Sequence, residues 1–177
     1  MRFLSGIVVT LLVIAGATAA LVWMGAVDVS ASRAEPAPLR WLFVTTRNRS
    51  IERHAPAVGP PPRLEAAKVQ GRGFEEFDEM CRVCHGAPGD EPSAIRQGLN
   101  PPPPDLGDDR VQHTYDDAEL FWIVKHGIRM TGMPAFGATH DDETLWSIVR
   151  FVRTLPRLDS RSYAALSKGK AGDHHHD

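Results

Sequence analysis

The stretch Cys81-Arg82-Val83-Cys84-His85 decides how the rest of this sequence is interpreted. Two cysteines three positions apart, with a histidine directly after the second, are typical of a site where haem is attached through thioethers. The two thiols must reach two vinyl groups on one edge of a porphyrin, so they have to be close but not adjacent. The imidazole of His85 then supplies the proximal iron ligand. The chain has no other cysteine, so we predict one haem c, covalently bound through Cys81 and Cys84.

Three other interpretations of this stretch are weaker. A zinc site needs two further ligands at zinc-like spacing, and none lies nearby in the sequence. A thioredoxin-type redox pair belongs in a βαβ context, whereas the surrounding pattern is helical. A disulfide across two residues gains little from so short a loop. Haem attachment also predicts an exported domain, because thioethers to haem form outside the cytoplasm, where free thiols are at risk of oxidation.

A methionine is the predicted sixth ligand. A low-spin electron carrier needs a second strong-field ligand, and a neutral thioether favours Fe(II). Met133 is our choice because Pro134 stiffens its loop, while Gly132 and Gly137 permit tight turns. Met130 is the alternative in the same loop, and both could instead be core filler.

Histidines offer further candidates. His113, His126 and His140 are chemically sound sixth ligands, but each lies near the end of a predicted helix, where a surface histidine is unremarkable. The cluster of His174, His175 and His176 could bind zinc or copper weakly. Its Gly, Lys and Asp neighbours favour a disordered tail instead.

A proline-rich loop follows the motif and needs its own explanation. The stretch Asn100-Pro-Pro-Pro-Pro-Asp105 cannot form a helix or a central strand. A ligating imidazole usually donates its other N–H to a carbonyl, which fixes the orientation of the ring. We therefore predict that the Pro104 carbonyl orients His85.

The N-terminal region predicts a membrane anchor. No charged residue occurs from Phe3 to Val27, and a helix of that length exceeds the roughly 30 Å hydrocarbon core of a bilayer. A cleaved signal peptide is the alternative, with small-residue sites at 17–19 and 29–31, but its apolar region would be shorter. Since the haem must lie outside the cytoplasm, we expect Met1 inside it.

The composition changes suggest four segments. We predict a transmembrane anchor over 1–27, an Ala/Pro/Arg-rich linker over 28–63, a helical domain over 64–157 and a polar tail over 158–177. Within the linker, residues 39–54 have the pattern of a short amphipathic helix. That helix either lies on the membrane surface, with Trp41 as an interfacial anchor, or packs against the helical domain.

The predicted domain contains three principal helices. The first covers 64–80, where Gly71 and Gly73 are helix-weakening residues that often mark a close helix crossing. The second lies within 114–127 and has Asp116 and Glu119 as a capping pair. The third opens at Thr139 or His140 and closes at 155–156.

These motifs together resemble the class I monohaem cytochromes c of the membrane-anchored bacterial type. The resemblance rests on the Cys81–His85 motif, on Pro104-Asp105-Leu106, on Gly132-Met133-Pro134, on Gly73 and Phe77, and on Phe151. It implies a small all-α fold around one covalent haem with His/Met ligation, and it makes Leu106 a haem contact.

The predicted function follows from that resemblance. We expect a membrane-tethered periplasmic electron carrier in the bacterial inner membrane, without substrate chemistry of its own and with redox proteins as partners. The alternatives are a haem subunit of a dehydrogenase or terminal oxidase, and a haem-based gas sensor. The net charge of −2 says nothing about nucleic acid, but the sequence has no Arg/Lys-rich block of the kind that follows phosphates, so we do not expect a nucleic-acid partner. Acidic residues outnumber basic ones over 65–157, which favours a basic docking patch on the redox partner.

Overall fold

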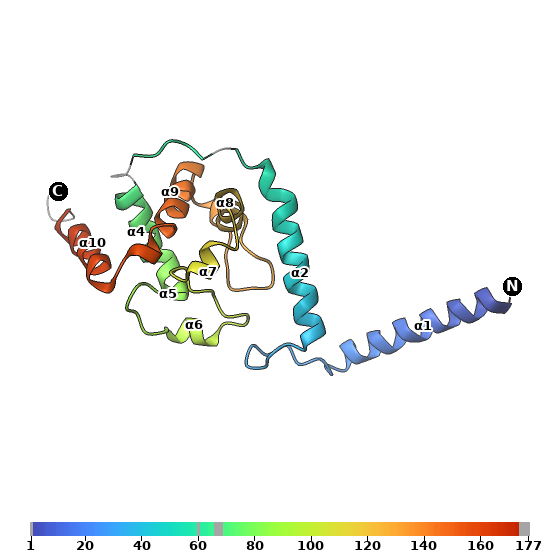
Figure 1. Cartoon of the computed structure of the whole chain (residues 1–177). Helices are drawn as coiled ribbons and strands as arrows, with labels where there is room; N and C mark the ends of the chain where they lie inside the picture. Colours follow the sequence, from blue (N-terminus) through green and yellow to red (C-terminus); the bar gives the residue numbers. More distant parts are fainter. Residues whose placement is uncertain (1, 60, 66–68, 174–177) are drawn as a thin grey trace. The chain divides into compact units, whose positions relative to one another are not determined.

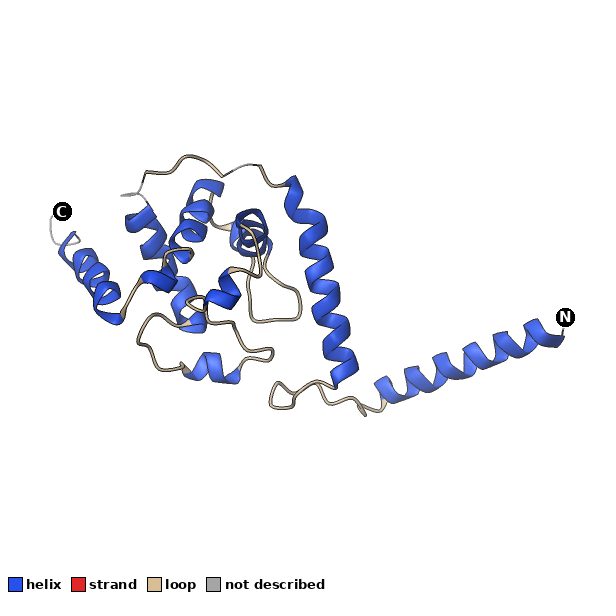
Figure 2. Cartoon of the chain, viewed as in Figure 1, coloured by secondary structure: helices blue, strands red, loops and turns tan. Residues whose placement is uncertain are grey.

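The structure is a computed structural model that describes residues 2–59, 61–65 and 69–173. The chain divides into two compact units, residues 1–33 and 34–177. Every regular element in the described residues is helical (Figure 2). The predicted all-α class is therefore confirmed.

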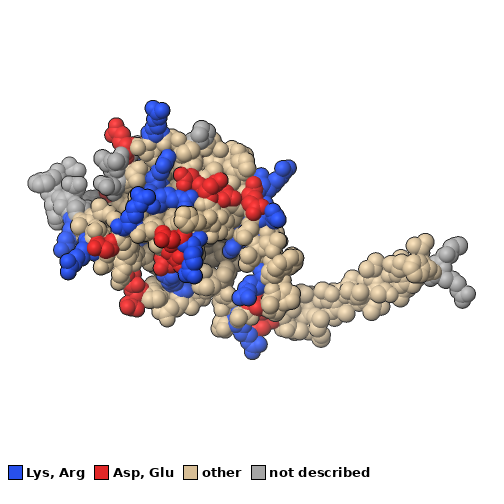
Figure 3. All heavy atoms as spheres, in the orientation of Figure 1, with Lys and Arg blue, Asp and Glu red and all other residues tan. Residues whose placement is uncertain are grey.

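The first unit is built around α1 (Arg2–Trp23), the apolar helix expected at the N-terminus. Residues 3–23 have a mean hydropathy of 2.3, and none of them is buried within the protein. At 1.5 Å per residue, α1 is about 33 Å long, which is enough to cross a bilayer. From Phe3 to Trp23 the helix carries no charged residue, and Figure 3 shows no Lys, Arg, Asp or Glu colour along this part. The prediction of one N-terminal helix that is long and apolar enough to span a membrane is confirmed.

The second unit contains the remaining elements (Figure 1). The segments η2, α4, η3 and α5 follow one another without a break, and we call them together the motif helix (residues 69–85). The bounds are α2 (Ala37–His54), η1 (Ala55–Ala57), η2 (Val69–Gly73), α4 (Phe74–Glu76), η3 (Phe77–Cys81), α5 (Arg82–His85), α6 (Ala94–Gly98), α7 (Asp109–Gln112), α8 (Asp117–His126), η4 (Phe136–Ala138), α9 (Asp142–Val152), η5 (Leu155–Arg157) and α10 (Ser160–Asp173).

The motif helix crosses α9 at Gly73. A Cβ atom added at Gly73 would lie 2.4 Å from the Ser147 carbonyl oxygen and 3.1 Å from the Cβ of Phe151. Only a residue without a side chain allows the two backbones to approach this closely. One turn further along, the rings of Phe77 and Phe151 lie 5.4 Å apart. The crossing expected from the sequence therefore occurs at Gly73, whereas Gly71 faces open space.

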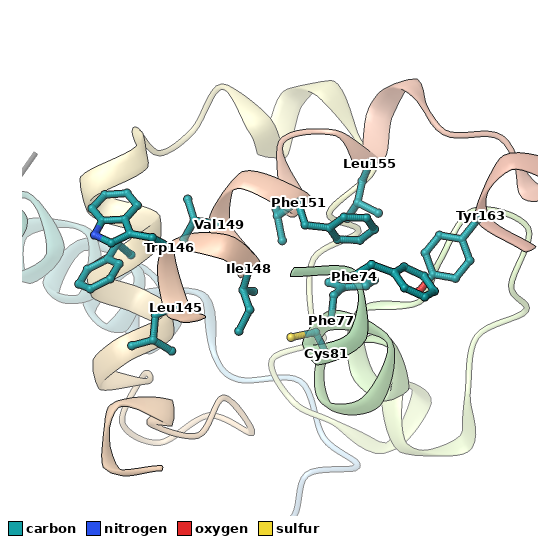
Figure 4. Close-up of a cluster of buried hydrophobic side chains, with 12 residues drawn as sticks. Phe74, Phe77, Cys81, Leu145, Trp146, Ile148, Val149, Phe151, Leu155 and Tyr163 are labelled. Carbon is teal, nitrogen blue, oxygen red and sulfur yellow. The ribbon is translucent and has the colours of Figure 1, made fainter. Parts of the chain in front are cut away.

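The hydrophobic core fills the angle between these two helices (Figure 4). Phe77 and Leu145 are fully buried, and Trp146 stacks on Phe121 of α8 with ring centroids 4.4 Å apart. Fully burying side chains of this size contributes about 1.5–3 kcal/mol each. Cys81 lies at one edge of the same cluster, so the core positions the motif directly.

The helix ends agree in part with the sequence. The predicted capping pair is present, because the Asp116 carboxylate accepts from the Glu119 N–H at 2.8 Å and the Glu119 carboxylate accepts from the Asp116 N–H at 2.9 Å. The start predicted for the last core helix is wrong. Its cap is Asp141, which accepts from the N–H of Thr144 at 2.8 Å, so the helix begins at Asp142 instead of Thr139 or His140.

Two further segments differ from the prediction. The helix predicted over 64–80 is described only from Val69, because residues 66–68 lie outside the described residues, and it runs on to His85. The predicted polar tail instead contains α10, whose Tyr163 is 3% exposed and packs edge-on against Phe74 at 5.3 Å. A single buried residue among polar neighbours gave no periodic pattern, so the sequence did not reveal it. The cluster of His174, His175 and His176 lies outside the described residues.

Helix α2 packs against the second unit through its C-terminal half. Ile51 is 1% exposed, and Ala55 just beyond the helix is 2% exposed. The hydroxyl of Tyr115 donates to the Asn48 carboxamide oxygen at 3.0 Å, and His54 stacks on Trp122. Of the two placements considered for this helix, these contacts favour packing on the helical domain for its second half. Trp41 in the first half is 68% exposed.

The glycine at the helix crossing provides a first prediction. Gly73→Ala should lower the free energy of unfolding by about 1–3 kcal/mol, because the new methyl group overlaps the Ser147 carbonyl. Gly71→Ala is the matched control in the same helix, and it should raise stability by about 0.5–1 kcal/mol. Urea unfolding of the two variants measures both changes. Equal effects at the two positions would contradict the crossing at Gly73.

Candidate functional site

The motif occupies the last turns of the motif helix. Cys81 is 8% exposed, and burial, with smaller contributions from Glu76 and Cys84, raises the pKa of its thiol to about 12. A reactive thioredoxin-type cysteine needs the opposite shift. Among the described residues, no group of three or more His, Cys, Asp or Glu side chains could hold a metal ion. The redox-pair and zinc interpretations therefore find no support in the geometry.

The imidazole of His85 is held by the proline-rich loop. Its Nδ1 lies 2.9 Å from the carbonyl oxygen of Pro104, the residue selected from the sequence for this contact. When Nδ1–H donates to that carbonyl, Nε2 is left with its lone pair free for a metal. Burial lowers the pKa of His85, and the bond to Pro104 acts in the opposite direction. Burial thus favours the neutral ring that a metal requires.

The loop after the motif is fastened to it by two further hydrogen bonds. Arg96 donates from Nη1 to the His85 carbonyl at 2.9 Å, and the Ser93 hydroxyl donates to the Val83 carbonyl at 2.5 Å. Ser93 and Arg96 belong to a short helix, α6, that the sequence did not predict. The Ser93 cap at its start is a recognisable pattern, but α6 is too short for a periodic signal.

The side chain of Arg82, inside the motif, contacts residues from three parts of the chain. Its guanidinium donates to Asp78 at 2.9 Å and, through two nitrogens, to both carboxylate oxygens of Asp90 at 2.8 and 2.9 Å. It also lies over the ring of Tyr163 in α10. The bidentate pair lowers the pKa of Asp90. The motif is therefore held by residues of the motif helix, the following loop and α10.

A cavity of about 340 Å³ opens beside the motif and is the strongest candidate site in the described part of the chain. Its volume falls within the usual range for cofactor pockets, and apolar side chains form most of its wall. Cys81, Cys84 and His85 line one part of it. Most of the other lining residues come from the proline loop, α8 and the loop that follows α8, and they include Leu99, Pro101, Pro104, Leu106, Leu120, Ile123, Val124, Ile128, Met133, Pro134 and Phe136.

The two methionines of the α8–η4 loop have different positions. Met133 lines the cavity and is partly buried, whereas Met130 is 76% exposed and does not line it. Of the candidate histidines, none lines this cavity. His113 and His126 are exposed, and His140 lies 3.3 Å from the Glu76 carboxylate.

Glycines hold the methionine loop against the rest of the site. Gly127 has φ +65° and lies so close to the loop that an added Cβ would be 2.7 Å from the Met133 carbonyl oxygen. The N–H of Ile128 donates to that carbonyl at 3.2 Å. On the other side, an added Cβ at Gly132 would be 2.5 Å from Leu99 of the proline loop. The loops carrying Met133 and Pro104 therefore meet at the cavity.

The residues around this cavity fit a haem. A haem needs a largely apolar pocket, two neighbouring thiols at its edge, and an imidazole whose second nitrogen is already bonded. The cavity wall supplies all three.

Comparison with known protein families agrees with this geometry. Residues 69–152 match the family described as cytochrome C oxidase, cbb3-type, subunit III. These residues form a class I c-type cytochrome domain. The match begins at the motif helix and ends with α9, so α1, α2 and α10 of this protein lie outside it. The search of curated proteins gave no match.

Several residues of the cytochrome cavity were missed as site residues in the sequence, and two of them have polar side chains that matter for the site. Arg47 of α2 and Tyr115 before α8 both line the cavity. Arg47 is one of several arginines in a basic helix, and nothing in the spacing of these arginines separates it from the others. Only the packing of α2 against the cytochrome domain brings it to the cavity.

The glycine beneath the methionine loop provides a second prediction. Gly127→Ala should destabilise the cytochrome domain by about 2–4 kcal/mol, because it combines a disfavoured φ with overlap against the Met133 backbone. Gly98→Ala is the control, since an added Cβ there meets open space and its φ is ordinary. Thermal unfolding of both variants tests this. A Gly127→Ala protein as stable as the control would show that the loop is not held at this glycine.

Proposed function

We propose that this protein is a membrane-anchored electron carrier with one haem c, attached through Cys81 and Cys84 and ligated by His85 and Met133. The observation that carries the proposal is a single apolar cavity that all four side chains line, with the imidazole already bonded to Pro104. The c-type cytochrome domain supports haem-based electron transfer.

The protein residues prepare the site for one-electron transfer. When bound, the haem iron supplies the redox chemistry by cycling between Fe(III) and Fe(II). Pro104 fixes the tautomer and the plane of the His85 ring. The thioether of Met133 is a soft, neutral ligand that favours the ferrous state. The apolar lining, including Leu106, Ile123 and Val124, keeps water away from the iron ligands and thereby raises the reduction potential.

We place the cytochrome domain in the periplasm, with α1 crossing the inner membrane. The support is the length and apolar character of α1 together with the need for thioether formation outside the cytoplasm. The partners would then be redox proteins at or near that membrane, donating to and accepting from the haem edge.

A third prediction tests haem attachment. Membranes containing the protein should show a c-type reduced-minus-oxidised spectrum, and the haem should remain on the polypeptide after denaturation. Cys84→Ala should leave the haem extractable or only weakly attached, because one of the two thioethers is lost, and Cys81→Ala should behave in the same way. Met130→Ala is the control and should keep covalent haem. A wild-type protein that carries no haem would overturn the proposed function.

A fourth prediction separates the two methionines. Met133→Ala should abolish the thioether–iron charge-transfer band and lower the reduction potential, because a soft ligand of Fe(II) is lost. Met130→Ala should leave both nearly unchanged, since its side chain is exposed. The reverse result would move the ligand to Met130. Tight binding of CO to the folded wild-type protein would instead support the gas-sensor alternative.

The family match favours a second candidate function. Residues 69–152 resemble a subunit of a cytochrome c oxidase, so the domain could serve as the haem c subunit of a larger oxidoreductase. Mild-detergent extraction of the full-length protein distinguishes the two functions. A carrier should be recovered alone, whereas a subunit should be recovered in a stable, stoichiometric complex with an enzyme.

A further inference from the structure

Helix α2 lies outside the region that matches the cytochrome family, yet it forms part of the wall of the haem cavity. Its contribution is Arg47. This side chain is half-buried, whereas Arg40, Arg49 and Arg53 of the same helix are exposed. The cavity is therefore closed in part by a segment that the family match does not include.

Arg47 differs in charge from everything else around the cavity. It is the one Arg, Lys, Asp or Glu among the described residues that line it. No described carboxylate forms an ion pair with it, whereas the exposed Arg49 pairs with Glu52 at 2.9 Å. A guanidinium removed partly from water without an anionic partner is unfavourable. Arg47 is therefore placed to pair with an anionic group of a ligand bound in the cavity.

Local hydrogen bonds fix the orientation of the Arg47 side chain and leave its two Nη groups available. Its Nε donates to the Asn48 carboxamide oxygen at 3.1 Å, and the Tyr115 hydroxyl donates to the same oxygen at 3.0 Å. Tyr115 is fixed in turn, because its carbonyl accepts from Arg153 Nη2 at 2.7 Å. No described residue bonds to the two Nη groups of Arg47. A fork of two N–H donors matches the geometry of a carboxylate.

The helix that carries Arg47 is held firmly on the domain. Ile51, one turn further along, is 1% exposed, and His54 stacks on Trp122 of α8 with ring centroids 5.8 Å apart. In Figure 1, α2 runs beside α8, in agreement with their packing contacts. Arg47 is thus placed by tertiary packing and not by a mobile linker.

We propose that Arg47 binds a propionate of the haem, which makes α2 a functional part of the cofactor site. A haem carries two carboxylates, and the cavity lining offers this one permanent cation to receive them. The inference rests on the proposed function, since it requires a haem in this cavity. Asn48 and Tyr115 are positioning residues that act through Arg47.

The test uses the full-length protein with its haem in detergent or membranes. Arg47→Gln removes the charge, Arg47→Lys keeps it, and Arg49→Gln is the matched control on the exposed side of the same helix. For each protein, the haem content, the thioether–iron band and the reduction potential from a redox titration are measured. Haem content comes first, because a wild-type protein without haem would refute the proposed function and not Arg47 in particular.

We expect Arg47→Gln to lower the potential relative to wild type while the thioether–iron band is retained. The loss of a cation beside the haem favours the more positively charged ferric state. Arg47→Lys should recover most of the loss, and Arg49→Gln should match wild type. A haem-loaded Arg47→Gln protein with the wild-type potential would overturn the inference. So would an equal decrease in Arg47→Lys and Arg47→Gln, because that result would trace the effect to packing and not to charge.

Discussion

The backbone contact between Gly73 and Ser147 is the constraint on which the remaining structure depends. Because a carbonyl of α9 occupies the space where a side chain would be, the motif helix and α9 are fixed at one crossing point. From that point the motif helix runs two further turns to Cys81, at the edge of the aromatic core. The direction in which the thiols and the imidazole face is therefore set by a packing contact that lies 8 to 12 residues earlier in the chain. The proline loop then meets the imidazole in a position that is already determined.

Features of this fold that depend on neighbouring residues could be predicted from the sequence, whereas some features that depend on tertiary packing could not. The Asp116 cap and the Gly127 stop are local, so the sequence alone predicted them correctly. The contact between Pro104 and His85 joins residues far apart in the chain, yet it was predictable because a ligating imidazole needs a carbonyl partner. Tyr163 and Arg47 were not predictable as core and cavity residues. Each is a single side chain in a polar or basic stretch, and it becomes a core or cavity residue only through the packing of its helix on the rest of the domain.

The cytochrome domain of this protein is larger than the region matched by its family. At one end, α2 covers part of the domain through Ile51 and reaches the cavity with Arg47. At the other end, α10 inserts Tyr163 between Phe74 and Arg82, where its hydroxyl donates to Asp78 at 2.9 Å. Both additions contact the motif helix or the cavity beside it. They extend the structure around the haem site and do not form separate modules.

The packing of α2 also shortens the segment that joins α1 to the cytochrome domain. The sequence suggested a linker over residues 28–63. In the structure, however, the C-terminal half of α2 packs on the cytochrome domain through Ile51. Only residues 24–36 join α1 (Arg2–Trp23) to α2 (Ala37–His54), and such a segment reaches at most about 45 Å when fully extended. For the proposed membrane-anchored carrier, so short a connection would keep the cytochrome domain in a thin layer next to the bilayer. Its redox partners would then be proteins whose redox centres open close to the same membrane surface.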